Sequence, residues 1–347
     1  MSRGDLLQLR PEGIYCPAGD FYLDPWRPVA RAVLTHGHAD HSRTGHGQYY
    51  LAETGLGIAR HRLGEQNFSP YPFAQSFAIG AVQVSFHSAG HILGSAQVRV
   101  EHQGEVWVLS GDYKRAADPT CAAFEVVPCD VFISEATFAL PIYRWPDTQQ
   151  VMAEILAWWQ ECAAQGVTAV LACYALGKAQ RILAELAAMS DTATSNAAVS
   201  AAAVSGGSVY LHGAMVPLVQ IYRAAGIALL PTEAVSEQSK QHDFAGALVL
   251  APPSALGTPW MQRFQKVSTG FASGWMQVRG QRRRQNHDRG FVLSDHADWP
   301  GLLASIQGSG AKRVLITHGQ SDALVRLLNE RGIAAEALRT ELGGEDV

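Results

Sequence analysis

The stretch THGHADH, residues 35–41, places three histidines and one aspartate within six positions. It directly follows an apolar run, residues 28–35, that predicts a buried strand. A turn leaving a rigid strand lets side chains at positions i, i+2, i+4 and i+5 converge on one centre. Imidazole and carboxylate are groups that a catalytic zinc ion prefers. The candidate metal ligands of this stretch are therefore His36, His38, Asp40 and His41.

Two later strand ends offer the further ligands that a pair of ions would need. In SAGHILGSA, His91 follows an apolar strand run, and its small neighbours leave room for an open coordination position. In VLSGDYK, Asp112 follows the run VWVL and has two carboxylate oxygens that can bridge two cations. Taken alone, each is better explained as a core histidine or a turn aspartate. Beside residues 35–41, both become predicted ligands.

Length and composition predict a globular protein of more than one domain. The chain has 347 residues, against about 150 for a typical domain. A hydrophobic fraction of 47% with 17% charged residues excludes disordered, collagen-like and fibrous chains. The formal net charge of −4 neither indicates nor excludes a nucleic-acid partner, because a local patch can be hidden in a balanced total.

The cysteines and the apolar segments indicate in which cellular compartment the protein is expected. The five cysteines are scattered and form no C-x-x-C pair, so neither disulfides nor cysteine-bound zinc is predicted. No segment has the pattern of a signal peptide or of a membrane span. We therefore expect a soluble, cytoplasmic protein.

The order of predicted elements changes along the chain. The first third is rich in short strands, at residues 28–35, 81–86, 97–101 and 106–109. After about Trp145, helices and strands alternate: helices are expected near 149–166, 178–189 and 217–225, and strands near 168–174, 208–212, 228–230 and 246–252. Such alternation favours a parallel, doubly wound layer. Residues 190–207, rich in Ala, Ser and Thr, are expected to form a surface loop.

The motifs H-x-H-x-D-H, A-G-H-x-x-G-S and S-G-D together resemble the metallo-β-lactamase superfamily. The chain is also similar to its β-CASP branch, through Glu135 in FISEATF, His296 in LSDHAD, His318 in LITHG and the segment YALGKAQRIL, residues 174–183. Within that branch, GDYKR, TGFASGWMQVRG and DRGFVLSDHADWPGLL look most like bacterial DNA ligase-associated exonucleases, which are relatives of the Artemis-type nucleases.

The resemblance implies an α/β fold in which one domain interrupts another. The metallo-β-lactamase domain, a four-layer αββα sandwich, would comprise residues 1–143 and 290–347, and a parallel α/β β-CASP insert would comprise residues 144–289. The implied ligands of one ion are His36, His38 and His91, and those of the other are Asp40, His41 and His318, with Asp112 bridging. Zinc is the expected metal, and manganese is an alternative because His/Asp sites accept both.

The resemblance and general chemistry together suggest a mechanism. Two divalent cations that share a water lower its pKa to about 7, which makes a bridging hydroxide the expected nucleophile. His296 is the candidate general acid, and Glu135 would hydrogen-bond it and raise its pKa. The candidate catalytic residues are therefore His296, Glu135, Asp40 and Asp112. A purely structural Glu135–His296 pair is the alternative. Asp24 in YLDPW is expected to orient the residues 35–41 turn.

Basic residues suggest where nucleic acid would bind. Between Trp260 and Gly290 there are seven basic residues against one acidic residue, a formal net charge of +6, as a phosphate-backbone contact requires. The candidate contacts are Arg279, Arg282, Arg283 and Arg284, the stacking residues Trp275 and Phe271, and Lys178 at a predicted helix start. A solvated loop for the arginines and a core position for Trp275 are the alternatives.

The expected activity is metal-dependent hydrolysis of DNA, as a 5′-to-3′ exonuclease in DNA repair, with DNA ligase and helicase partners implied by the resemblance. His318 favours an RNA-processing nuclease instead, since a histidine at that motif is typical of RNA-processing members. A small-molecule ester, thioester or lactam hydrolase of the same fold is a further alternative. The Glu135–His296 pair and the basic segment argue against it.

Overall fold

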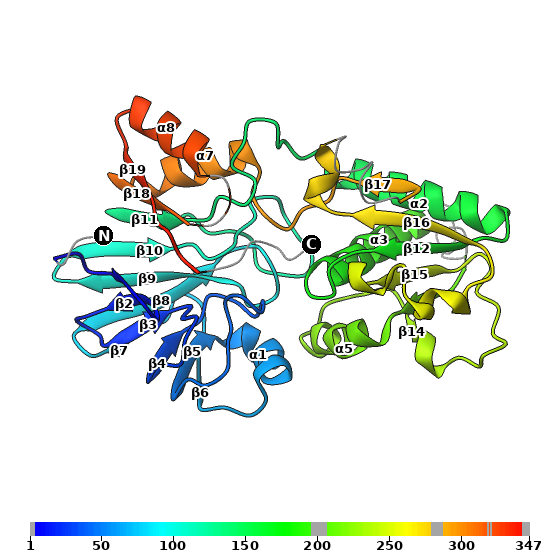
Figure 1. Cartoon of the computed structure of the whole chain (residues 1–347), viewed down its shortest axis with the longest axis horizontal. Helices are drawn as coiled ribbons and strands as arrows, with labels where there is room; N and C mark the ends of the chain where they lie inside the picture. The colour runs from blue at the N-terminus through cyan, green and yellow to red at the C-terminus, as the bar shows by residue number, and fades with distance from the viewer. Residues whose placement is uncertain (1–3, 196–206, 279–286, 318, 320, 342–347) are drawn as a thin grey trace. The chain divides into compact units, whose positions relative to one another are not determined.

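The computed structural model describes residues 4–195, 207–278, 287–317, 319 and 321–341. The chain divides into two compact units (Figure 1). Unit 1 comprises Met1–Arg144 and His296–Val347, and unit 2 comprises Trp145–Asp295. Unit 1 is therefore built from two segments that are far apart in the sequence. No helix in the described ranges is long and apolar enough to cross a membrane.

Two sheets form the centre of unit 1. Among its described residues, the first sheet has the order β1-β2-β3-β4-β5-β6: β1 (Gln8–Arg10), β2 (Gly13–Cys16), β3 (Phe21–Leu23), β4 (Arg31–Val33), β5 (Gln48–Ala52) and β6 (Phe68–Tyr71). The second has the order β19-β18-β11-β10-β9-β8-β7: β7 (Ser76–Ile79), β8 (Val82–Ser88), β9 (Ala96–His102), β10 (Glu105–Leu109), β11 (Val131–Ser134), β18 (Arg313–Ile316) and β19 (Ala334–Ala337).

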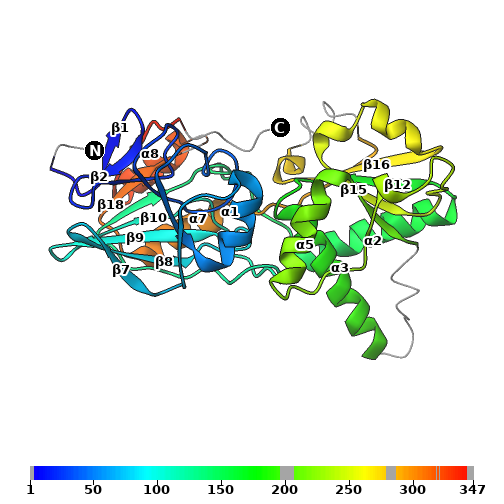
Figure 2. The ribbon, with the colours of Figure 1, turned by 90° about the horizontal axis from the view of Figure 1, so that it is seen from below.

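The packing of unit 1 gives four layers. One apolar cluster joins Leu23 and Val33 of the first sheet to Val84 and Val98 of the second, so the sheets pack face to face. Helix α1 (Leu56–Leu63) covers the outer face of the first sheet. Helices α7 (Trp299–Ser309) and α8 (Asp322–Glu330) cover the outer face of the second sheet (Figure 2). The layer order is helix, sheet, sheet, helix.

Strand direction places several loops of unit 1 at one edge of the second sheet. Strands β10, β11 and β18 are parallel, with Trp107 opposite Val131 and Val131 opposite Arg313. Their carboxyl ends therefore meet at the same edge. Strand β8 is antiparallel to β9, which is antiparallel to β10, so β8 also ends at that edge.

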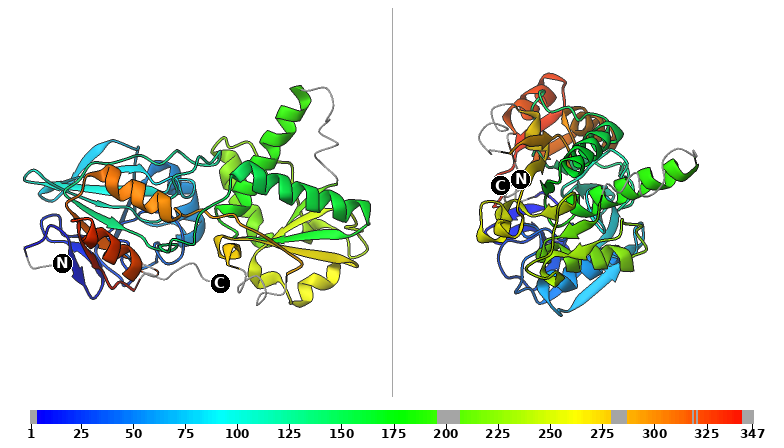
Figure 3. Two further views of the ribbon diagram at one scale, coloured as in Figure 1. Left: turned by 90° about the horizontal axis from the view of Figure 1, so that it is seen from above. Right: turned by 90° about the vertical axis from the view of Figure 1, so that its right-hand side faces the viewer.

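Unit 2 contains one parallel sheet. Within the part of unit 2 that the structure describes, the strand order is β14-β13-β15-β12-β16-β17: β12 (Thr168–Ala172), β13 (Val209–Leu211), β14 (Glu233–Ala234), β15 (Leu248–Ala251), β16 (Val267–Ala272) and β17 (Arg289–Phe291). Helices α2 (Thr148–Ala164), α3 (Lys178–Ser195) and α5 (Val216–Ala224) pack on one face. The end of α3 extends away from the rest of this unit (Figure 3). The predicted α/β class and the parallel sheet are confirmed. The expected doubly wound layer is wrong, because the three helices described for this unit lie on one face of the sheet.

Two predicted elements of unit 2 are wrong. Residues 228–230 form no strand, because the amide of Leu230 donates to Leu183 at 3.3 Å and its carbonyl accepts from Arg223 at 2.7 Å. The predicted loop from residue 190 is helical as far as Ser195, since α3 continues through it. Residues 196–206 of that predicted loop lie outside the described residues.

Candidate metal centre

The turn that follows β4 carries His36, His38, Asp40 and His41. The amides of His41 and Ser42 both donate to the carbonyl of His38, at 3.2 and 2.9 Å, which closes the turn. Helix α1 packs directly against it: a Cβ atom on Gly37 would lie 2.4 Å from Cγ2 of Ile58. Only glycine fits there without displacing Ile58. Glycine between His36 and His38 therefore allows the turn to pack closely against α1.

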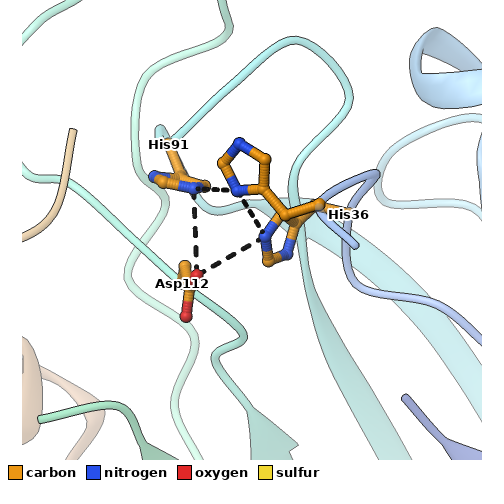
Figure 4. A group of neighbouring side chains, drawn as sticks. His36, His91 and Asp112 are labelled. Atoms are coloured by element: carbon orange, nitrogen blue, oxygen red, sulfur yellow. Dashed lines mark hydrogen bonds and ion pairs between the residues drawn. The ribbon is translucent and has the colours of Figure 1, made fainter. Parts of the chain in front are cut away.

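Three imidazoles and a carboxylate converge at this turn. Nε2 of His36 and Nε2 of His91 lie 3.1 and 3.0 Å from Nδ1 of His38. Oδ2 of Asp112 lies 3.5 Å from Nε2 of His36 and 3.9 Å from Nε2 of His91 (Figure 4). One ligand atom from each of the four residues lies within 4.8 Å of the others. This donor set fits a divalent cation such as zinc.

Burial suits His36 to ligand chemistry. Its side chain is buried, and burial together with the neighbouring His41, His38 and His91 holds its pKa well below the usual range. A neutral imidazole has a lone pair to give to a cation, whereas an imidazolium has none. His36 is therefore in the state that metal binding requires.

His41 lies in a more acidic environment. Burial lowers its pKa, but the carboxylates of Asp112, Asp24 and Asp40 outweigh burial and raise it to about 10. Its Nε2 lies 3.5 Å from Oδ2 of Asp112 and 3.6 Å from Oδ2 of Asp40. A cation bound at this nitrogen would have to displace a proton, so binding there would strengthen as pH rises.

Asp24 directly follows β3 and connects the end of that strand to the turn after β4. It is buried and has a φ of 39°, a left-handed conformation that is rare outside glycine. Its carboxylate accepts from the amide and the hydroxyl of Thr35, at 2.7 and 2.6 Å. Its Oδ2 also lies 2.7 Å from Nδ1 of His41. That contact leaves Nε2 of His41 as the atom that faces Asp112.

Asp24→Asn should weaken metal binding while leaving the fold intact. An amide cannot accept from both Thr35 and His41 in the present geometry, so the turn loses its orientation. We expect the affinity for zinc to fall by about 10- to 100-fold, measured by titration against a competing chelator. The control is Asp20→Asn, because Asp20 is an exposed partner of Arg31. Equal affinity in Asp24→Asn and wild type would contradict the role of Asp24.

Glu135 and His296 form a second buried arrangement beside Asp112. Nδ1 of His296 lies 3.0 and 2.9 Å from the two oxygens of Glu135. Glu135 also accepts from the amide of Tyr113 at 2.8 Å and the hydroxyl of Thr137 at 2.5 Å. Burial raises the pKa of Glu135, but His296 and these bonds outweigh burial and lower it. Glu135 is therefore a carboxylate.

Two chemical roles are open to this pair. The ring of His296 lies 4.7 Å from that of His91, centroid to centroid. Ligand atoms of Asp112, Glu135 and His296 lie within 4.8 Å of one another, so the three could hold a cation instead of donating a proton. This alternative was missed from the sequence, where the second ion is assigned to Asp40, His41 and His318. His318 lies outside the described residues.

Several curated proteins are similar in sequence to this chain. No protein-family model matches the chain. A protein of Opitutus terrae named "Probable DNA ligase" is 32% identical over 344 residues, 96% of this chain and 31% of that protein. An "RNase J-like protein" of Methanocaldococcus jannaschii is 29% identical over 104 residues, 29% of this chain and 25% of that protein. "Cleavage and polyadenylation specificity factor 73" of Drosophila melanogaster is 30% identical over 113 residues, 32% of this chain and 16% of that protein.

The fold has a structural relative as well. A crystal structure of a protein of unknown function from Enterococcus faecalis V583 matches with a TM-score of 0.57 at 12% identity, covering 90% of this chain and 80% of that one. The chain belongs to the β-CASP branch of the metallo-β-lactamase superfamily. It spans less than a third of the length of each of the three curated relatives above.

Some of the predicted nucleic-acid contacts of this β-CASP chain lie outside the described residues, and others lie within them. Arg279, Arg282, Arg283 and Arg284 lie outside the described residues. Trp275 is half-buried and packs against Phe271 and Met276, as in a core position. Phe271 is only 2% exposed, which is too little for a base to stack on it, so its suggested stacking role is wrong.

Lys178 does begin a helix, but its ammonium is not at the surface. The side chain is fully buried, and Nζ lies 3.4 Å from Oδ2 of Asp295 and 4.7 Å from the ring centroid of Tyr174. This environment favours a structural role over a phosphate contact. Asp295 carried no signal in the sequence apart from its place directly before His296.

Proposed function

We propose that this chain is a two-metal-dependent nuclease that hydrolyses phosphodiester bonds of DNA, acting as a 5′-to-3′ exonuclease in DNA repair. The observation that carries the proposal is the position of Asp112. Its carboxylate is near both the three-imidazole cluster and the Glu135–His296 pair. A cation site and a proton donor on either side of one carboxylate suit the hydrolysis of a phosphodiester, in which an alkoxide leaves.

The residues of the site would divide the work as follows. Divalent cations, when bound, would lower the pKa of water and offset the charge of the phosphate. His36, His38 and His91 would hold one cation through their imidazoles. Asp112 would share its charge with a second cation, for which the family resemblance implies Asp40, His41 and His318 as ligands. Glu135 accepts from Nδ1 of His296 and so keeps the proton of Nε2 for the leaving oxygen.

The choice of DNA rests on the length of the match. The relative named as a DNA ligase matches 96% of this chain, whereas the RNase J-like protein matches 29% of it. The ligase name also motivates a ligase partner and a role in repair. An RNA-processing nuclease is the second candidate, favoured by His318 and by relatives named endoribonuclease. A helicase partner and a cytoplasmic location remain predictions, and a small-molecule hydrolase is the least supported alternative.

Digestion of end-labelled nucleic acid tests the proposal. Single- and double-stranded DNA and RNA, with 5′-phosphate or 5′-hydroxyl ends, are incubated with the protein in Zn²⁺, Mn²⁺ or Mg²⁺. We expect 5′-labelled DNA to release short labelled products first, only with metal present. Preferential cleavage of RNA would support the second candidate, and cleavage of neither would overturn the proposed function.

The arginine run at residues 282–284 should set the salt dependence of binding. Replacing Arg282, Arg283 and Arg284 by glutamine should weaken DNA binding and flatten the salt dependence by about 0.9 in log–log slope for each lost phosphate contact on duplex DNA. The matched control neutralises three exposed arginines of unit 1, Arg326, Arg331 and Arg339. An unchanged slope in the first variant would show that the run is a solvated loop.

A further inference from the structure

A buried polar network at the start of α3 holds the chain just before His296. Nη1 of Arg181 donates to the carbonyl of Ser294 at 2.7 Å and lies 3.3 Å from Oδ1 of Asp295. The other carboxylate oxygen, Oδ2, lies 3.4 Å from Nζ of Lys178. These four residues are at most 5% exposed. Both oxygens of Asp295 thus face cations of the same helix, and the preceding carbonyl is held as well.

The same guanidinium reaches a second helix. Nη2 of Arg181 donates to Oγ1 of Thr148, the first residue of α2, at 2.9 Å. The loop before α3 is held in turn by Gln180, which accepts from the amide of Gly177 at 2.7 Å and donates to the carbonyl of Ala175 at 2.9 Å. Arg181 therefore joins the starts of two helices to residues 294–295.

Stability alone is a weak reason for such a network. Removing charged groups from water carries a desolvation cost that often exceeds their mutual attraction. Apolar residues of similar volume commonly give the folded protein equal or greater stability. What buried ion pairs and a planar guanidinium provide is a fixed geometry. The segment that Arg181 fixes therefore matters more than the free energy of its contacts.

That segment ends next to the proposed proton donor. Consecutive Cα atoms are about 3.8 Å apart, so a backbone fixed at Asp295 limits where the Cα of His296 can lie. The imidazole of His296 is held separately, by Glu135 at 2.9 Å. We propose that Arg181 is a positioning residue for His296: it fixes Ser294 and Asp295 so that the imidazole meets both Glu135 and the leaving oxygen. This inference rests on the proposed function.

The first variant to test is Arg181→Lys. Lysine keeps the charge but lacks the planar fork that contacts Ser294, Asp295 and Thr148 together. We expect the single-turnover cleavage rate to fall by about 10- to 100-fold, the size of effect that a shift of about 1 Å in a catalytic group can produce. Bound metal and DNA affinity should remain as in wild type. The matched control is Arg223→Lys, because Arg223 contacts Leu230 and Thr232 in the same unit.

A double-mutant cycle separates positioning from general structural support. If Arg181 acts through His296, Arg181→Lys should cost almost nothing further in a His296→Ala background, because the group that it positions is gone. We expect less than about a twofold further loss there, against about 10- to 100-fold in the wild-type background. An equal loss in both backgrounds, or no loss in either, would overturn the inference.

The outcomes also distinguish this inference from the function on which it rests. Asp295→Asn serves as a second variant, because an amide has one acceptor oxygen and cannot accept from both Arg181 and Lys178. Its loss of cleavage rate should also disappear in the His296→Ala background. An active wild type with an unchanged rate in Arg181→Lys and Asp295→Asn overturns the positioning role alone. A wild type that cleaves no nucleic acid overturns the proposed function, and this inference with it.

Discussion

Asp112→Ala should lose bound metal and nuclease activity together. Oδ2 of Asp112 lies 3.5 Å from Nε2 of both His36 and His41, so its carboxylate is the negative charge on which the imidazoles converge. Its removal leaves nitrogen ligands without the carboxylate that is proposed to bridge two cations. The affinity for metal should fall by more than the loss of about 10- to 100-fold that is expected for a residue that only supports a ligand. Metal content is measured by plasma mass spectrometry after reconstitution and cleavage by an end-labelled assay.

The Asp112→Asn variant serves as the matched control for packing at the same position. It keeps the shape of the side chain and removes only its charge, so it too should lose metal if the charge is what matters. Thermal unfolding of both variants shows whether the fold survives. Two ions per chain retained in Asp112→Ala would contradict the bridging role.

His296→Ala should keep the metal and lose turnover. The proposed proton donor contributes to the rate and not to cation binding, so the cleavage rate should fall by about 10²- to 10⁴-fold. DNA affinity should be unchanged. The matched control is His102→Ala, since Nδ1 of His102 contacts only a backbone carbonyl, that of Ala81, among the bonds described for it.

The metal content of His296→Ala decides between the two roles of this histidine. Asp112, Glu135 and His296 are close enough to hold a cation. If the variant loses one of two ions per chain, His296 is a ligand and the proton donor lies elsewhere. A cleavage rate equal to that of wild type would exclude both roles.

Much of the metal centre could be predicted because it follows from strand ends. His91, Asp112 and Glu135 come shortly after β8, β10 and β11, which end at one edge of a sheet. The convergence of their loops at one edge follows from the order and directions of the strands in the sheet. Glu135 was expected from the family resemblance alone. The turn at residues 35–41 is local in the same sense, since its ligands lie within a few positions of one another.

The rest depends on contacts between residues far apart in the sequence. The helix start at Lys178 was predictable, but the burial of its ammonium is set by Asp295, which no local pattern reveals. Phe271 has an aromatic ring that could stack on a base, but Ala172 and Met276 pack against it and bury it. The bonds of Asp24 to Thr35 and His41 likewise depend on how β3 and the turn pack.

The most direct test measures bound metal and cleavage on the same sample. The protein is stripped with a chelator and titrated with Zn²⁺ or Mn²⁺ while end-labelled DNA is digested. We expect no cleavage without metal, and cleavage that rises as bound metal approaches two ions per chain. Cleavage by the metal-free protein, or binding that saturates well below two ions per chain, would contradict it.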